Sequence, residues 1–457
     1  MIRLKNKDRE QMDMLNSSLW KAVLLFSLPI AFSNILQQLF NAVDIGVVGK
    51  FASDNDMTAV SANATVTALF INIVTGLSVG PNVIIAKLIG QDRKREIQDA
   101  VHTVIAFALI FGIVLMGIGE AVADPLLRVI STQESIFDLA KLYYRIYFLG
   151  IPFFVVYCFG AAILRSKGDT FRPLIILMIS GVFNTALNLV LVLLFHMGVA
   201  GVAVATSMSN ALSAICILIL LCRESDMVRL SWKKVRIHKE YLSKIIKVGF
   251  PAALQSAVFS ISNVCIQKGI NSFGEEATAG SMVGLTYEYY CFYLINSFSQ
   301  AAITFTGQNY GARKLDRCKK IILVCSVEGM VLTIVLSSVF MIFGHPLTGL
   351  FTGNELIIMY ALTRMQHIMT LEFLTGTYEI AGGVIRGTGR SLLPAIITVI
   401  GSVCFRIFWL FCIFPIKHSF GLLMSVYPVS WVLTAAMMYT AYYFVTRKVF
   451  NEESTLV

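Results

Sequence analysis

The sequence predicts an all-α integral membrane protein with twelve transmembrane helices, arranged as two parallel six-helix repeats (an N-lobe and a C-lobe) around a central cleft. Three observations predict this fold class: 56% of the 457 residues are hydrophobic, only 14% are charged, and long apolar stretches recur along the chain. Soluble domains carry about 25% charged residues, and about 20 apolar helical residues cross a bilayer core of about 30 Å. The composition therefore excludes a water-soluble protein.

The apolar stretches divide into twelve expected spans, separated by turns that are rich in glycine, proline or charge. These spans are residues 20–48, 57–89, 97–119, 135–164, 171–195, 199–222, 242–270, 277–310, 318–343, 355–386, 392–415 and 421–446. The residues before the first span are polar and lack the short apolar core of a secretory signal peptide. We therefore expect no removable leader.

Basic residues cluster in alternate loops, at Arg93–Arg95, Arg223–Lys247 and Arg313–Lys320, while the intervening loops are poor in lysine and arginine. This alternation is the positive-inside pattern of membrane proteins. The net charge of +10 therefore reflects membrane topology and does not indicate a nucleic-acid partner. It predicts a multi-pass protein of the plasma membrane with both termini in the cytoplasm.

The two halves of the chain resemble each other. Pro29 recurs as Pro251 at an offset of 222, and Arg165, Gly168 and Pro173 recur as Arg386, Gly389 and Pro394 at an offset of 221. Because one repeat holds an even number of helices, both repeats start on the same side of the membrane and are parallel. Two facing lobes of this kind suit alternating access.

This organisation gives five expected segments: a cytoplasmic N-terminal segment at 1–19, the N-lobe with helices 1–6 at 20–222, a basic cytoplasmic linker at 223–241, the C-lobe with helices 7–12 at 242–446, and a cytoplasmic tail at 447–457. Within the first helix of each lobe, Pro29 and Pro251 remove a backbone hydrogen bond and predict a kink. Their shared position favours a functional kink, and a static bend that only improves packing is the alternative.

Polar residues in the N-lobe spans predict a cation site. At about 1.5 Å per residue, Asp44 lies about 36 Å along the first helix from its cytoplasmic start, and Asn188 lies about 22 Å in from Pro173, so the two could meet. Asn184 shares the helix face of Asn188, and Thr206 on the next helix adds a hydroxyl. This oxygen-rich group could hold a proton or transiently a sodium ion, whereas the asparagines and the threonine taken singly could simply bond helices together.

The C-lobe spans are more highly charged. Glu288 and Arg406 both come out at mid-depth, which predicts an ion pair between them. Glu379 and Glu372 are seven residues apart and are expected on one face of one helix. They would suit a cationic substrate, or they could pair with nearby arginines. The candidate substrate residues of this lobe are Glu288, Glu372, Glu379, Arg406 and Gln255, and Glu328 is placed inside a span without a role.

Several motifs together resemble the multidrug and toxic compound extrusion family. They are Phe40-Asn41-Ala42-Val43-Asp44, Gln308-Asn309-Tyr310-Gly311-Ala312, Ile385-Arg386-Gly387-Thr388-Gly389 and Tyr427-Pro428-Val429-Ser430-Trp431, within a resemblance that runs from about Leu15 to Arg447. The resemblance implies a secondary active antiporter that exports cationic amphiphilic compounds in exchange for protons or sodium ions by alternating access.

The resemblance also implies site residues. Asp44 corresponds to the family's first-helix aspartate, Asn184 to its fifth-helix asparagine, Thr206 to its sixth-helix threonine and, more weakly, Tyr143 to a fourth-helix residue. Asn188 departs from the pattern, because many members carry a second aspartate there, and this leaves the coupling ion open. A second departure is Phe259, which stands where some relatives have a glutamate.

Other classes of protein fit less well. A flippase of lipid-linked saccharides needs several cationic residues facing its cleft, and a membrane enzyme needs a nucleophile or an acid and metal pattern that the sequence lacks. A channel would need a filter-like loop. The nine cysteines form no C-x-x-C pair, so we expect no structural metal and no cofactor. The expected partners are small cationic molecules and membrane lipid, and the expected state is a monomer.

Overall fold

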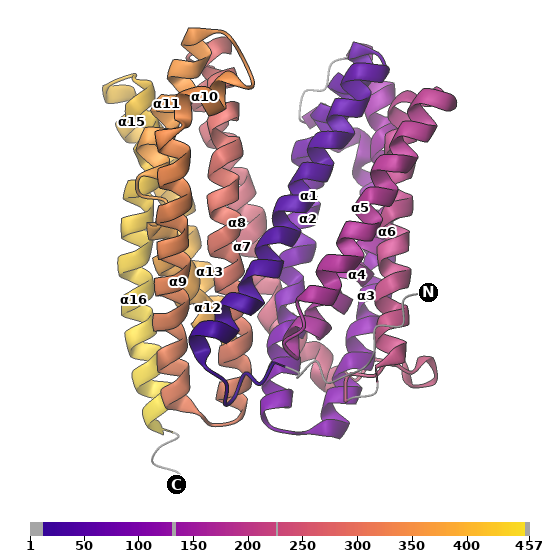
Figure 1. Cartoon of the computed structure of the whole chain (residues 1–457), viewed down its shortest axis with the longest axis vertical. Helices are drawn as coiled ribbons and strands as arrows, with labels where there is room; N and C mark the ends of the chain where they lie inside the picture. The colour runs from indigo at the N-terminus through magenta and orange to yellow at the C-terminus, as the bar shows by residue number, and fades with distance from the viewer. Residues whose placement is uncertain (1–11, 130–133, 225–226, 453–457) are drawn as a thin grey trace. The chain divides into compact units, whose positions relative to one another are not determined.

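A computed structural model describes residues 12–129, 134–224 and 227–452, and all regular elements in these ranges are helices (Figure 1). Parts of the expected N-terminal segment and of the expected tail lie outside the described residues. Within these described ranges, ten helices are long and apolar enough to cross a membrane. The remaining two expected spans are α8 and the pair α11–α12. The prediction of an all-helical membrane protein is confirmed.

The helices follow the expected spans closely. In the first half the structure has α1 (Leu19–Phe51), α2 (Asp54–Gly90), α3 (Lys94–Val129), α4 (Phe137–Ser166), α5 (Phe171–Leu189) and α6 (Gly198–Arg223), with a π-helix η2 (Val190–Leu194) extending α5. The second half has α7 (Lys239–Asn271), α8 (Glu275–Gly311), α9 (Leu315–Ile342), α10 (Gly344–Gly349), α11 (Glu355–Met369), α12 (Leu374–Gly387), α13 (Leu392–Thr398), α14 (Phe405–Phe408), α15 (Phe420–Met424) and α16 (Val426–Glu452). Short π and 3-10 segments connect α13 to α14 and follow α14.

The chain forms two compact units. Unit 1 comprises residues 1–13 and 32–247, and unit 2 comprises residues 14–31 and 248–457. Two of the three boundaries fall inside continuous helices, after Ala31 in α1 and after Lys247 in α7. These positions lie within a few residues of the two helix prolines, Pro29 and Pro251.

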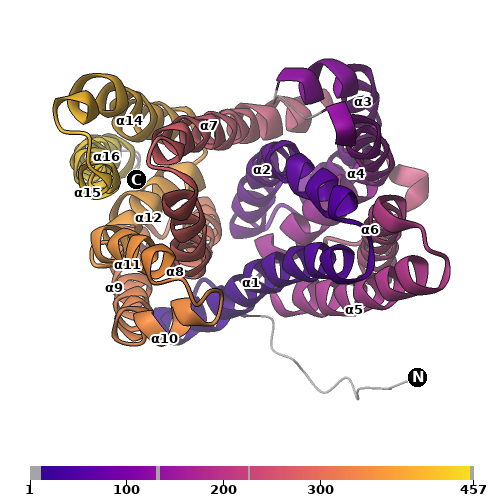
Figure 2. The same cartoon turned by 90° about the horizontal axis from the view of Figure 1, so that it is seen from above.

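Each unit is built around the fourth span of its repeat. In unit 1, α4 packs against α2, α3 and α6, and in unit 2 the pair α11–α12 packs against α8, α9 and α16 (Figure 2). Small residues allow close approach in these central helices. A Cβ on Gly150 of α4 would lie 2.8 Å from Cα of Ser207 on α6, and one on Gly383 of α12 would lie 2.8 Å from the carbonyl oxygen of Ser299 on α8.

The backbone repeats in detail. Gly168 and Gly389, which are 221 residues apart, adopt φ angles of 98° and 95° in the turn after the fourth span of each repeat. Positive φ of this kind is accessible to glycine without steric penalty. The two glycines therefore give the same backbone conformation to the equivalent turn of each half.

The tenth expected span is broken, which corrects one expectation. Residues 370–373 form a turn between α11 and α12, where Leu371 N–H donates to Ile368 O (3.1 Å) and Leu374 N–H donates to Leu371 O (2.9 Å). Because these i to i+3 bonds tighten the chain, Glu372 lies in the turn, whereas Glu379 lies on α12. The expected placement of both glutamates on one face of one helix is wrong.

The segment between the two repeats is fixed to unit 1. Val228 and Leu230 are buried, the backbone N–H of Ser231 donates to Nε2 of His102 (3.0 Å), and the N–H of His238 donates to Oγ1 of Thr103 (3.1 Å). Both His102 and Thr103 lie on α3. The basic segment expected as a linker therefore packs against a transmembrane helix along part of its length.

Candidate functional site

Asp44 is the centre of a buried polar group in unit 1. Its side chain is 7% exposed and accepts hydrogen bonds from Nδ2 of Asn188 (2.5 Å, to Oδ1) and from Oγ1 of Thr206 (3.2 Å, to Oδ2). Asn184 completes the group, since its Oδ1 accepts from Asn188 Nδ2 (3.3 Å) and its Nδ2 donates to Thr206 Oγ1 (3.4 Å). Asp44 and Asn188, which the sequence predicts could meet, are in contact.

The register of α1 against α5 brings these groups together. Phe40, one turn before Asp44, packs over Gly181 so closely that any Cβ at position 181 would overlap the ring. Further along the same two helices, Asp44 meets Asn188. The two contacts lie in the same order along α1 and α5, as expected for helices that run in the same direction. Directly after Asn188 and Leu189, the helix widens into the π-helix η2, a distortion that is frequent at functional sites.

The group is rich in oxygen and carries a single carboxylate. Asn188 Oδ1 is buried and has no hydrogen-bond partner, so one acceptor is uncommitted. Together with the carboxylate of Asp44 and the Thr206 hydroxyl, it gives the hard oxygen ligands that suit a small cation. The described residues contain no cluster of three or more His, Cys, Asp or Glu side chains that could hold a metal ion. The site could therefore take up a proton or a weakly bound monovalent cation.

Two tyrosines of α4 border this group. Tyr143 and Tyr147 are buried, their rings lie 6.0 Å apart, and both interact electrostatically with Asp44. Neither makes a hydrogen bond to the carboxylate among the described residues. Tyr143 is therefore a neighbour of the site, and its role in coupling stays a prediction.

In unit 2, Glu288 pairs with Arg364. Arg364 is 2% exposed, and its Nη2 and Nε lie 2.6 and 3.1 Å from Oε2 of Glu288. The expected pair between Glu288 and Arg406 is wrong. Arg364 lies on α11, which packs directly on α8, and Gly284 one turn before Glu288 lets the arginine stem pass at 3.1 Å from its ideal Cβ position.

Arg406 is held by neutral and aromatic groups. It is 1% exposed, its Nε donates to Ser430 (3.3 Å) and its Nη1 to Asn263 (3.4 Å). Its guanidinium lies 5.0 Å from the ring centre of Phe259 and 4.5 Å from that of Tyr427. Phe259 thus faces Arg406 by a cation–π contact.

The other acidic residues of unit 2 also lie near arginines. Glu372 is 1% exposed and interacts electrostatically with Glu288, Arg364 and Arg406, while its Oε2 has no hydrogen-bond partner. Glu379 lies 3.8 Å from Arg386, whose Nη2 donates to Oε1 of Gln255 (2.8 Å). The candidate substrate residues therefore form two charge-compensated groups, one around Glu288 and one around Glu379.

The sequence offers Arg364 only as a possible partner of Glu372 and Glu379, and Tyr427 only as part of a family motif, without a role at this site. Tyr427 lies between two arginines, with the guanidinium of Arg364 at 5.4 Å and that of Arg406 at 4.5 Å from its ring centre. A depth count places Arg364 about 14 Å along its helix, close to the level of Glu288, so this pair could have been found from the sequence.

A second missed cluster joins the turn after α4 to the end of α6. The carboxylate of Glu224 accepts from Lys167 Nζ (2.5 Å) and from Arg172, which also bonds Asp169. Burial alone would raise the pKa of Glu224, but the hydrogen bonds and charges of Lys167 and Arg172 outweigh it and hold this pKa below its usual value. The cluster joins the turn after α4 to the end of α6 and has no part in the Asp44 group.

Comparison with known proteins shows one family. The model of the MatE family matches residues 29–190 and again residues 251–411, which together exceed half of the chain. The second match begins 222 residues after the first, as the repeat predicts. The internal duplication is confirmed.

Individual relatives agree over nearly the full length. The chain is 26% identical over 441 residues to "Probable multidrug resistance protein YoeA" of Bacillus subtilis, covering 94% of this chain and 95% of the relative. It is 23% identical to "Multidrug export protein MepA" of Staphylococcus saprophyticus, covering 87% and 88%. A crystal structure of MATE in complex with MaL6 superposes with a TM-score of 0.89 at 20% identity, covering 97% of this chain and 99% of that one.

Proposed function

Because this chain belongs to the MatE family of transporters, we propose that it is a secondary active antiporter that exports cationic amphiphilic compounds in exchange for an ion. The observation that carries the proposal is the single carboxylate of Asp44, buried among the amides of Asn188 and Asn184 and the hydroxyl of Thr206. Burying a lone carboxylate inside the membrane costs free energy, so its presence there indicates a function. Multidrug export is also what the names of the relatives YoeA and MepA describe.

We infer that the coupling ion is the proton. Asn188 replaces a potential second carboxylate by a neutral amide, so the group carries one negative charge and attracts a sodium ion less strongly than two would. A single proton can still neutralise Asp44. Sodium remains the alternative ion, since the oxygens of Asp44, Asn188 and Thr206 would be its ligands.

Thr206 gives the protonation a local mechanism. Its hydroxyl oxygen lies 3.2 Å from Asp44 Oδ2 and 3.0 Å from the carbonyl oxygen of Val202, and its one hydrogen can serve only one of them at a time. While Asp44 is ionised, the hydroxyl donates to the carboxylate. When Asp44 is protonated on Oδ2, the carboxyl group donates to Thr206 and the hydroxyl turns to Val202. Proton uptake by Asp44 thereby changes the hydrogen bonding of Thr206 on α6.

The test is export of a fluorescent cationic dye by inverted membrane vesicles under separately imposed pH and sodium gradients. We expect Asp44→Asn to abolish coupled export while the protein stays folded and inserted, because an amide keeps the size of the side chain but cannot titrate. Glu240→Gln is the matched control, as it removes an exposed carboxylate that pairs with Lys244. Export by Asp44→Asn at the wild-type rate would refute the proposed site.

The sidedness follows from the charge pattern. We propose that the protein lies in the plasma membrane with both termini in the cytoplasm, since the basic loops are the cytoplasmic ones under the positive-inside rule. We further propose that it works as a monomer and without a cofactor.

A further inference from the structure

The turn between α8 and α9 has a direct counterpart in the other repeat. Arg313 in this turn adopts a φ angle of 57°, and Asp92, 221 residues earlier in the turn between α2 and α3, adopts a φ angle of 51°. The two turns therefore share one backbone conformation, and their side chains can be compared position by position. Left-handed φ angles are tolerated by aspartate and asparagine far better than by most other residues. Aspartate fits this position and arginine does not, so the conformation itself does not select Arg313.

The two turns differ sharply in charge. Residues 313–320 contain five basic residues and one acidic residue, net +4, whereas the equivalent residues 92–99 contain three of each, net zero. Both segments begin the third span of their repeat and, because the repeats are parallel, lie on the same side of the membrane. Topology therefore does not require the excess charge in the second repeat.

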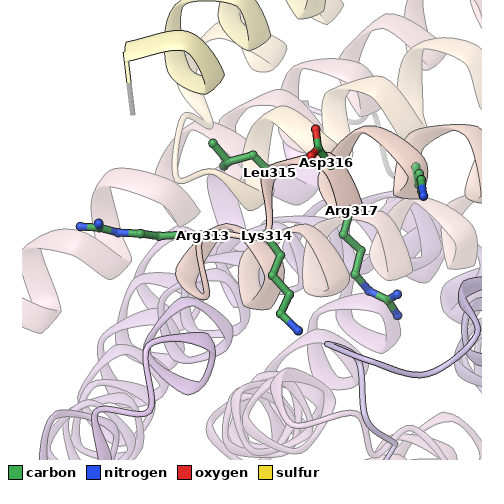
Figure 3. Close-up of a pocket in the computed structure, with 6 residues that line it drawn as sticks. Arg313, Lys314, Leu315, Asp316 and Arg317 are labelled. Atoms are coloured by element: carbon green, nitrogen blue, oxygen red, sulfur yellow. The ribbon is translucent and has the colours of Figure 1, made fainter. Parts of the chain in front are cut away.

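The basic residues of the second turn line a hollow of about 370 Å³ (Figure 3). It is formed by Arg313, Lys314, Leu315, Asp316, Arg317 and Lys320. In Figure 3 the side chains of Lys314 and Arg317 extend to one side of the ribbon, and Asp316 extends to the other.

Part of this charge already has a partner. Lys314 Nζ donates to the carbonyl oxygen of Leu15 (3.1 Å) and to Oδ1 of Asn16 (2.6 Å), and Arg317 donates to the carbonyl oxygen of Met14. Asp316 lies 3.5 Å from Lys319. Within the described part of the chain, Arg313 and Lys320 have no acidic partner, so the hollow keeps two uncompensated cations.

We propose that this hollow binds an anionic phospholipid headgroup, whose phosphate is attracted by the two uncompensated cations Arg313 and Lys320. An arginine fork matches phosphate oxygens and a lysine adds a point charge. The span of α9 begins at Leu315, inside the turn itself, so the hollow lies where a membrane-spanning helix leaves the hydrocarbon, at the level of lipid headgroups. Basic clusters directly beside a transmembrane helix attract anionic lipids. Binding of the lipid phosphate then accounts for an arginine at position 313, where the left-handed backbone itself favours aspartate or asparagine.

The test uses the purified full-length protein in a neutral detergent, with phosphatidylglycerol or phosphatidylcholine as the probe and native mass spectrometry as the readout. We expect one phosphatidylglycerol to be retained in preference to phosphatidylcholine, and the variant R313N/K320Q to bind it at least fivefold more weakly. The control K94Q/R95Q removes two exposed positive charges from the equivalent turn of the first repeat and should bind as the wild type does.

Two further measurements keep the result unambiguous. The melting temperature of R313N/K320Q should equal or exceed that of the wild type, because asparagine suits the left-handed backbone. If the double variant melts at a lower temperature, the binding measurement uses the single variant K320Q in its place. Inorganic phosphate at millimolar concentration should not displace phosphatidylglycerol. Equal loss of binding in R313N/K320Q and K94Q/R95Q, unchanged binding in K320Q and R313N/K320Q, or displacement by inorganic phosphate would each overturn the assignment of a lipid site.

Discussion

Asn188 sets the charge of the buried group in unit 1. Its Nδ2 lies 2.5 Å from Oδ1 of Asp44, so an aspartate at this position would place two carboxylates in direct contact. Two carboxylates at this distance cannot both ionise without a bound cation, because like charges disfavour each other's ionised form. The identity of one residue thus decides how strongly the group attracts a cation.

We predict that Asn188→Asp shifts the coupling from protons toward sodium. A second negative charge about 4 Å from a bound cation is worth at least about 1 kcal/mol, or roughly a fivefold to tenfold gain in affinity. The measurement is dye export by vesicles at constant pH with a sodium gradient, compared with export driven by a pH gradient alone. The control Asn188→Ala removes the amide without adding charge and should not gain sodium dependence. Robust sodium-driven export by the unmodified protein, with no response to a pH gradient, would contradict the proton assignment.

At the scale of elements, a buried ion pair between Glu288 and Arg364 joins α8 to α11 in unit 2. We predict that Glu288→Gln and Arg364→Met each lower stability by about 3–5 kcal/mol, because each leaves one buried charge without its partner, and that the double variant loses less than the sum. Thermal unfolding in detergent gives the comparison as shifts in melting temperature.

Arg406→Met is the matched control for this cycle. Arg406 is as deeply buried as Arg364, but among the described residues its hydrogen bonds go to the neutral side chains of Ser430 and Asn263, and its guanidinium lies against the rings of Phe259 and Tyr427. Its removal strands no hydrogen-bonded carboxylate and a methionine can pack on the rings, so the loss should be smaller. Strict additivity of Glu288→Gln and Arg364→Met would show that the two residues are not coupled.

The sequence predicts the elements well and the partners of side chains only in part. Helix bounds follow from the length of apolar runs, and the meeting of Asp44 with Asn188 follows from depth, since both rest on a constant rise per residue. Depth does not give the direction in which a side chain points around its helix, so depth alone pairs Glu288 with Arg406, whereas its partner is Arg364. The break at residues 370–373 has no proline or glycine to announce it and depends on packing.

At the scale of the whole molecule, two helices are divided between the compact units. Residues 19–31 of α1 cluster with unit 2 and its remainder with unit 1, while residues 239–247 of α7 cluster with unit 1 and its remainder with unit 2. The first helix of each repeat therefore takes part in both units. Any relative movement of the units must be absorbed within these two helices, close to Pro29 and Pro251.

We predict that Pro29→Ala and Pro251→Ala slow dye export several-fold without lowering the melting temperature. Proline inside a helix removes one backbone hydrogen bond and costs about 3 kcal/mol relative to alanine, so alanine stabilises a straight, continuous helix at the place where the units divide. The double variant should be slower than either single variant. Pro125→Ala is the control, because Pro125 also lies inside a helix, α3, but this helix belongs to unit 1 along its whole length. The measurement is the export rate in vesicles, normalised to the amount of folded protein. Equal slowing in all three single variants would mean that helix prolines matter only for packing. Unchanged export in Pro29→Ala and Pro251→Ala would show that transport does not need a proline kink in the two divided helices.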